Sequence, residues 1–282
     1  MTSPAPIPVI TVIRLTRAWN IIIVVIAQYA AAGFLIGVET IADPLLVVLS
    51  ISTGLVAASG YVINDYFDVK IDLINKPDKV LVGTDVSRRK AIFLHSFLAT
   101  AGTIAGLVID WRLAFINAVS AFLLWWYSST LKRAPFVGNL AIAVLTGLSL
   151  MVLYIRYPEA GPRIMYYAVF AFTVTLIREA VKDMEDVRGD QAFGCRTLPI
   201  IWGIAKTKFY TAVLILMLMG AIVLVHLRFM PLPVSYFLAL VMLPLGLFSW
   251  RLMRADTTRE FQQLSSWCKY IMLLGISSMA AL

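Results

Sequence analysis

Charge-free stretches about as long as a bilayer is thick recur along most of this 282-residue chain. A helix needs about 20 apolar residues to cross the hydrocarbon core of a membrane. The stretches on that scale are Ala18–Val38, Pro44–Asn64, Ala91–Ile109, Leu113–Leu131, Ala134–Ile155, Phe209–Leu227 and Phe229–Trp250. Ile164–Ile177 and Tyr270–Leu282 are shorter candidates. The pattern predicts an all-α, polytopic membrane protein with about nine transmembrane helices.

The distribution of charge predicts how these helices are oriented. The net charge is +8, yet only 14% of the residues are charged. Cytoplasmic loops of membrane proteins collect Lys and Arg. In the predicted topology, all but four of the 24 Lys and Arg residues fall on the same side of the membrane as the N-terminus. The four exceptions are Arg112, Arg156, Arg163 and Arg228. We therefore expect a cytoplasmic N-terminus and a cell-membrane protein whose basic loops need no nucleic acid partner.

A faint internal repeat lies in the longer, predicted cytoplasmic loops. Asn64–Asp72 and Asp183–Asp190 each contain the pattern D-x-x-D-x-x-x-D. Each copy follows the inner end of an even-numbered predicted helix, the second and the sixth. Residues at these spacings return to one face of an α-helix. If both helices continue through their motifs, each presents a column of three carboxylates on the cytoplasmic side.

Such columns indicate a cation site, because closely spaced carboxylates repel one another. Mg²⁺ is commonly held by one or two carboxylates together with water and phosphate oxygens of a substrate. Two facing columns would suit a diphosphate bridged by two or more Mg²⁺ ions. Basic residues on the same side would contact the phosphates: Arg17, Lys132, Lys182 and Arg133, with Lys70 as a further candidate. One such motif can be an ordinary solvated loop, whereas two matched motifs favour a site.

These residues resemble the two signatures of the UbiA superfamily of intramembrane prenyltransferases, with Asn64 preceding the first motif. Arg17-x-x-Asn20 and Lys132-Arg133 extend the resemblance, while Ala18 departs from the proline that many members carry. The resemblance implies a helical bundle around a central cavity with a cytoplasmic polar cap, and one domain over residues 1–282 with a loose tail at 1–10. It implies Mg²⁺-dependent transfer of a prenyl group from a polyprenyl diphosphate to a lipophilic acceptor. The catalytic and metal-site core that the resemblance implies is Asn64, Asp68, Asp183 and Asp186 or Asp190. Asp65 and Asp72 would support or orient this metal site.

A narrower resemblance concerns the acceptor. The segments Arg178–Asp186, Arg196–Pro199 and Ile74–Lys79 are similar to the geranylgeranylglycerol-phosphate geranylgeranyltransferase branch. This resemblance implies a geranylgeranyl-type donor and a phosphate-bearing acceptor. Partners for that phosphate would be Lys76, Lys79, Arg88 and Arg89, although an ordinary positive loop explains them equally well.

Departure of a diphosphate leaves an allylic cation, which aromatic faces can stabilise. Candidates at a suitable depth are Tyr61, Phe122, Trp125, Trp126, Tyr127 and Phe172, each of which can instead be a packing or interface residue. A terpene cyclase would use the same chemistry without an acceptor. A membrane transporter would place ionisable groups near mid-membrane, where this chain is nearly free of charge. A non-catalytic membrane protein would not need two matched columns.

Overall fold

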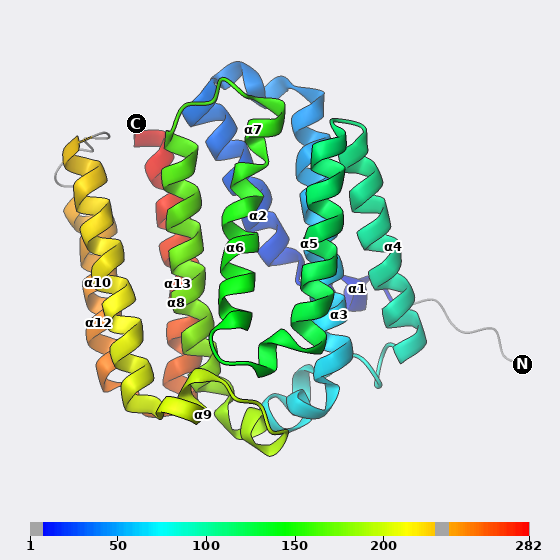
Figure 1. Ribbon diagram of the computed structural model, residues 1–282, viewed down its shortest axis with the longest axis vertical. Coiled ribbons are helices and arrows are strands. Elements are labelled where there is room, and N and C mark those ends of the chain that lie inside the picture. The colour runs from blue at the N-terminus through cyan, green and yellow to red at the C-terminus, as the bar shows by residue number, and fades with distance from the viewer. Residues whose placement is uncertain (1–7, 229–236, 282) are drawn as a thin grey trace, which may run out of the picture. The chain divides into compact units, whose positions relative to one another are not determined.

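The computed structural model describes residues 8–228 and 237–281 (Figure 1). In that part of the chain the fold is all-helical, as predicted, and its β pairing is limited to an isolated bridge between Val82 and Val86. The α-helices are α1 (Val9–Leu15), α2 (Ala18–Ala30), α3 (Pro44–Asn75), α4 (Arg88–Leu107), α5 (Trp111–Ser129), α6 (Val137–Met151), α7 (Leu153–Arg156), α8 (Arg163–Ala192), α9 (Leu198–Trp202), α10 (Ile204–Arg228), α12 (Leu243–Arg254) and α13 (Thr258–Ser278).

Short 3-10 and π segments connect or extend these helices. They are η1 (Ala31–Ile36), η2 (Val38–Ala42), η3 (Pro77–Lys79), η4 (Leu131–Arg133), η5 (Phe237–Met242) and η6 (Met279–Ala281). The predicted loose tail is wrong at residues 9 and 10, because α1 already begins at Val9. The rest of that tail, residues 1–7, lies outside the described residues.

Within the described residues, 6 helices are long and apolar enough to cross a membrane. They are Ala18–Ile36, Pro44–Asn75, Arg88–Leu107, Val137–Arg156, Arg163–Ala192 and Ile204–Arg228. The predicted spans Leu113–Leu131, Phe229–Trp250 and Tyr270–Leu282 overlap α5, α12 and α13, but residues 229–236 and 282 lie outside the described part. The count of nine spans stays a prediction. The helix over the last span begins at Thr258, earlier than the charge pattern suggested.

Two of these helices are longer than a bilayer requires. α3 has 32 residues and α8 has 30, which at 1.5 Å per residue gives lengths of about 48 and 45 Å, against a hydrocarbon core of about 30 Å. Their polar C-terminal ends therefore continue beyond the apolar span. Both D-x-x-D-x-x-x-D motifs lie inside these helices, so the predicted continuation of each helix through its motif is confirmed.

The chain forms two compact units, one made of residues up to 25 together with 47–130, the other of 26–46 and 131–282. In the first unit, buried polar groups join α3, α4 and α5. Ser52 Oγ donates to the carbonyl of Gly102 at 2.9 Å, and Asn117 Nδ2 donates to both of these residues. A Cβ at Gly102 would lie 3.0 Å from the carbonyl oxygen of Ser52, so glycine lets the two helices approach. Small residues and polar links of this kind hold helices together in lipid, where the hydrophobic effect does not.

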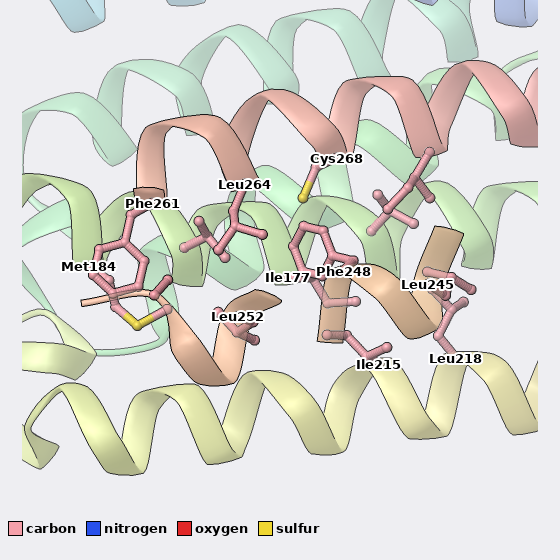
Figure 2. Packing of buried hydrophobic residues seen from close by; sticks show 14 residues of the cluster. Ile177, Met184, Ile215, Leu218, Leu245, Phe248, Leu252, Phe261, Leu264 and Cys268 are labelled. Atoms are coloured by element: carbon pink, nitrogen blue, oxygen red, sulfur yellow. The ribbon is translucent and has the colours of Figure 1, made fainter. Parts of the chain in front are cut away.

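The second unit has its core between α8, α10, α12 and α13 (Figure 2). Phe248 and Leu252 of α12 are fully buried there, next to Ile215 of α10 and Leu264 of α13. Figure 1 shows α8 running alongside α13 in this unit, from the polar end at Ala192 back to Arg163. This side-by-side arrangement fixes the axis of α8 and with it the direction of its acidic end.

Asp43 joins the start of α3 to the end of α7 in the second unit. Its carboxylate accepts hydrogen bonds from the Leu45 backbone N–H at 2.9 Å and from Tyr157 Oη at 2.9 Å, and it pairs with Arg156 Nη2 at 2.8 Å. Burial alone raises the pKa of the Asp43 carboxyl, but the hydrogen bonds and the charge of Arg156 outweigh burial, so the pKa lies below its usual value. The carboxylate therefore stabilises the fold in its ionised form.

We expect Asp43→Asn to lower the free energy of unfolding by about 1–2 kcal/mol at neutral pH, because the bond to a charged partner is lost. A carboxyl with a lowered pKa in the folded state contributes stability above its unfolded pKa, about 3.9, and loses it as the pH falls through the folded value. The difference between the wild type and the variant in detergent should therefore shrink below about pH 4.

The matched control is Asp110→Asn. Asp110 also caps a helix, α5, but its arginine partner, Arg112, lies two residues away. Loss of such an exposed local pair should change the free energy of unfolding less than loss of the Asp43 contacts. Equal losses at both positions would contradict a long-range role for Asp43.

Candidate functional site

The first acidic column lies on the polar end of α3. Asn64, Asp65, Asp68 and Asp72 are all helical and half-buried. Asn64 Nδ2 donates a hydrogen bond to Asp68 Oδ2 at 2.8 Å, one turn further on. The amide thereby holds one oxygen of Asp68 in place while both side chains keep oxygen atoms that can accept a cation.

Arg17 approaches this column from the break between α1 and α2. Its Nη2 donates to Asp65 Oδ1 at 2.8 Å, and its guanidinium lies 5.0 Å from the centre of the Tyr61 ring. The backbone of Arg17 has φ +50°, a left-handed conformation that is uncommon outside glycine. Backbone strain of this kind persists where surrounding contacts over-determine it and clusters at functional sites. Asp65 thus orients Arg17.

The loop after α3 folds back against the same helix. Leu81, Val82 and Val86 are buried together with Val62 of α3. Arg88, at the start of α4, lies with its guanidinium 4.3 Å from the centre of the Tyr66 ring. The polar end of α3 is therefore held both by Arg17 and by this loop.

The second acidic column lies on the polar end of α8, in the other unit. Asp183, Asp186 and Asp190 are helical and half-buried. Asn139, near the start of α6, donates from Nδ2 to Asp183 Oδ2 at 2.8 Å. Asn139 is only 7% exposed, so the amide holds Asp183 from a protected position.

Sequence reasoning missed Asn139. It lies inside a long apolar stretch, and nothing in its spacing relates it to Asp183. A signal did exist, because a buried amide in an apolar helix needs a polar partner, but the sequence does not say which partner it has.

Lys182 forms an ion pair with a carboxylate on its own helix. Its Nζ donates to Glu179 Oε2 at 3.1 Å, while Arg178 Nη1 donates to Glu179 Oε1 at 2.8 Å. Glu179 is 4% exposed and lies one turn before Asp183 on the same helix. This buried carboxylate, which sequence reasoning also missed, holds two cations beside the second column.

Lys132 and Arg133 lie in η4, directly before α6. A Cβ at Gly138 would lie 2.9 Å from the Leu131 carbonyl and 3.0 Å from Lys132 Cα, so glycine allows η4 to lie tightly against the start of α6. The Arg133 carbonyl accepts the Arg196 backbone N–H at 2.8 Å. Backbone contacts therefore place both predicted phosphate-binding residues beside Asn139 and the loop that follows α8.

The predicted aromatic residues belong to both units and have different neighbours. Tyr61 contacts Arg17, and Phe172 packs where α8 meets Gly147 of α6. The Phe122 ring lies tilted against Trp125 and Trp126, with centroids 5.9 and 6.1 Å away. These three rings are exposed (Phe122 by 59%, Trp126 by 44%), which favours the interface role that tryptophan commonly has in membranes. Tyr127 is half-buried.

Neither column forms an all-protein metal cage by itself. Among the residues that the structure describes, no three His, Cys, Asp or Glu side chains gather closely enough to hold a metal ion. The donors are nevertheless hard oxygens of the kind that Mg²⁺ prefers, and Mg²⁺ usually takes one or two carboxylates and completes its shell with water and phosphate. The residues present therefore fit Mg²⁺ that binds together with a phosphate ligand. That the two columns face each other stays a prediction.

Several helices are long and apolar enough to cross a membrane, and two of them end in columns of carboxylates. These features define a helical integral membrane protein with acidic residues at the polar ends of two helices. A family comparison places the chain more narrowly. The model of the UbiA prenyltransferase family matches residues 22–272, and the chain belongs to this family. The resemblance inferred from the two motifs is confirmed.

Relatives and solved structures agree with this assignment. The chain is 41% identical over 169 residues to the digeranylgeranylglyceryl phosphate synthase of Thermococcus gammatolerans, a match that covers 60% of each protein. It is 39% identical over 201 residues to that of Methanoculleus marisnigri, covering 70% of each. The first match therefore spans less than two thirds of the relative's length.

Among solved structures, one from work on digeranylgeranylglyceryl phosphate synthase in membranes is 25% identical, with a TM-score of 0.68 over 96% of this chain and 98% of that one. A UbiA homologue from Archaeoglobus fulgidus, bound to GPP and Mg²⁺, has a TM-score of 0.67 over 96% and 100% of the two chains. At 13% identity, the second likeness shows the fold alone.

We expect Asn139→Leu to weaken Mg²⁺ binding by about 10- to 100-fold, because outer partners that orient ligating carboxylates have effects of this size. The measurement is the rise in unfolding temperature of the purified protein as Mg²⁺ is added with inorganic pyrophosphate. Thr146→Val is the control, since the Thr146 hydroxyl bonds only within α6, to the Ile142 carbonyl. An unchanged response in Asn139→Leu would show that its bond to Asp183 is merely structural.

Arg17→Gly should separate ligand binding from stability. Glycine removes the strain of the left-handed backbone, about 1 kcal/mol, which offsets loss of a half-exposed ion pair worth at most about 1 kcal/mol. We expect an unfolding temperature close to that of the wild type and a loss of pyrophosphate affinity of about tenfold, which follows from about 1.4 kcal/mol. A large fall in stability would mean that Arg17 is primarily a structural residue.

Proposed function

We propose that this protein transfers a prenyl group, of the geranylgeranyl type, from its diphosphate to the hydroxyl of a prenylglycerol phosphate. The observation that carries the proposal is the pair of helical carboxylate columns, each held by a side chain from a distant part of the chain: Asp65 by Arg17, and Asp183 by Asn139. The names of the relatives from Thermococcus and Methanoculleus support this choice of donor and acceptor.

The proposed cofactor is Mg²⁺, in two or more ions. The structure of the Archaeoglobus homologue, bound to GPP and Mg²⁺, supports the metal in a protein of this fold. In this chain Asn64, Asp68, Asp183 and Asp186 would supply oxygen ligands, with Asp65, Asp72 and Asp190 around them. Bound Mg²⁺ would neutralise the negative charge that develops on the leaving diphosphate.

The chain's own residues would then orient and neutralise the donor. Arg17 and Lys132 would contact phosphate oxygens, with Arg133 and Lys182 as further phosphate-binding residues. The bond between the prenyl C1 and the diphosphate oxygen breaks, and its electron pair leaves with the diphosphate. The acceptor hydroxyl oxygen bonds to C1, an ether forms, and the hydroxyl proton passes to a carboxylate or to the released diphosphate. Tyr61 and Phe172 are the aromatic candidates that lie nearest to column residues along their helices.

The loop between α3 and α4 is the proposed contact for the acceptor phosphate. Lys79, Arg88 and Arg89 are exposed, and Lys76 is half-buried. Arg88 is already held over Tyr66. Binding a phosphate there would therefore cost less side-chain entropy than binding it to a freely moving arginine. The concentration of Lys and Arg in this and the other long loops supports a cytoplasmic site and a cytoplasmic N-terminus.

The test is the mass of the product formed by purified protein with Mg²⁺, geranylgeranyl diphosphate and geranylgeranylglycerol phosphate. We expect a product that joins the two and releases diphosphate. A cyclised hydrocarbon formed without acceptor would identify a terpene cyclase instead, and no consumption of diphosphate under any condition would refute the proposal.

Asp68→Ala and Asp186→Ala should each lower turnover at least about 100-fold, because each removes a metal ligand. The matched control is Asp85→Ala, which removes an exposed acid from the loop after α3 but lies outside both motifs. We expect the control to retain wild-type turnover. Undiminished activity of either motif variant would remove the columns from the mechanism.

A further inference from the structure

An apolar pocket of about 300 Å³ lies in the second unit, between α8, α10, α12 and α13. Its lining includes Tyr167 and Phe170 of α8, Val225 of α10, Leu245 of α12 and Leu274 of α13. Tyr167 precedes Asp183 by sixteen residues on one helix, which corresponds to about 24 Å. The pocket therefore lies toward the end of α8 opposite to its acidic column.

Two hydroxyl groups of the lining residues do not disfavour an apolar ligand. Tyr167 Oη and Ser278 Oγ, which both belong to lining residues, hydrogen-bond to each other at 2.8 Å. Because each hydroxyl already has a partner, burying hydrocarbon against this pair leaves no unsatisfied polar group and carries no penalty of that kind. The walls suit a hydrocarbon chain rather than a polar solute.

Two exposed arginines stand at the same end of the unit. Arg163 is the first residue of α8, one turn before Tyr167, and Arg228 is the last residue of α10, two residues after the lining residue His226. Neither forms an ion pair within the described part of the chain, and the sequence from 229 to 236 contains no acidic residue.

The other two arginines of the predicted outer loops are different. Arg112 pairs with Asp110 at 2.9 Å, and Arg156 pairs with Asp43 at 2.8 Å. Of the four predicted outer arginines, Arg163 and Arg228 are therefore the two that pair with no carboxylate of the described residues. Positive charge at the membrane surface attracts anionic lipid.

From this combination we infer that the pocket is a binding site for one anionic membrane lipid, with a hydrocarbon chain between α8, α10, α12 and α13 and a phosphate head group at Arg163 and Arg228. The site is separate from the acidic column of α8 and does not depend on the proposed reaction. Its occupant would fill space inside the second unit and neutralise two cations at its surface.

Native mass spectrometry of the protein, released from vesicles of equal parts phosphatidylglycerol and phosphatidylcholine, tests the site. We expect one phosphatidylglycerol to be retained in preference to phosphatidylcholine. The double variant Arg163→Gln/Arg228→Gln should lose that preference by about tenfold or more, since two surface cations supply about 2 kcal/mol. Arg112→Gln is the matched control and should retain the lipid.

Ala221→Phe tests the chain-binding part separately, because Ala221 lines the pocket and a larger side chain would occupy it. It should reduce retention of both lipids, with unfolding temperature measured to confirm that the variant folds. If Ala221→Phe does not fold, competition decides instead: added phosphatidylglycerol should displace a spin-labelled analogue from the wild type. Retention without preference for phosphatidylglycerol, or equal retention in the double variant, would overturn the inference. Displacement of the lipid by geranylgeranyl diphosphate would also overturn it, since the pocket would then belong to the prenyl donor.

Discussion

The constraint on which this structure depends is that a backbone in lipid must satisfy its own hydrogen bonds, which helices do. α3 and α8 do not stop where the apolar span ends but keep the same hydrogen-bonded geometry into polar surroundings. Because each helix continues through its motif, the spacing of its aspartates places them on one face of the helix. A loop in place of either helix end would scatter the three carboxylates that the helix aligns.

Each column is held by a side chain from a distant part of the sequence. Arg17 reaches Asp65 across 48 positions, and Asn139 reaches Asp183 across 44. The Arg17–Asp65 contact is ionic, and Arg17 has a left-handed backbone conformation. The Asn139–Asp183 contact is a hydrogen bond from a buried amide. Both fix a carboxylate before any ligand arrives, and pre-positioned groups of this kind lower the cost of binding.

Much of this arrangement was predictable from the sequence, and the rest depends on contacts between distant segments. Length and charge determine that α3 and α8 span and that their motifs are helical. Asn139 could not be assigned, because no local pattern links an amide in one apolar helix to an acid in another. Phe122 and Trp126 were chosen by depth along their helix, but depth does not specify which face is exposed. Lys182 was assigned by its charge, and its pairing with Glu179 depends on which side of α8 is buried.

The pairing of Glu179 also bears on how readily a phosphate ligand leaves. Arg178 and Lys182 already share this carboxylate, so under the proposed function an arriving phosphate would compete with it for Lys182. When the phosphate leaves, Lys182 would return to Glu179. If the protein transfers prenyl groups as proposed, this buried carboxylate would lower the affinity for the diphosphate product and speed its release.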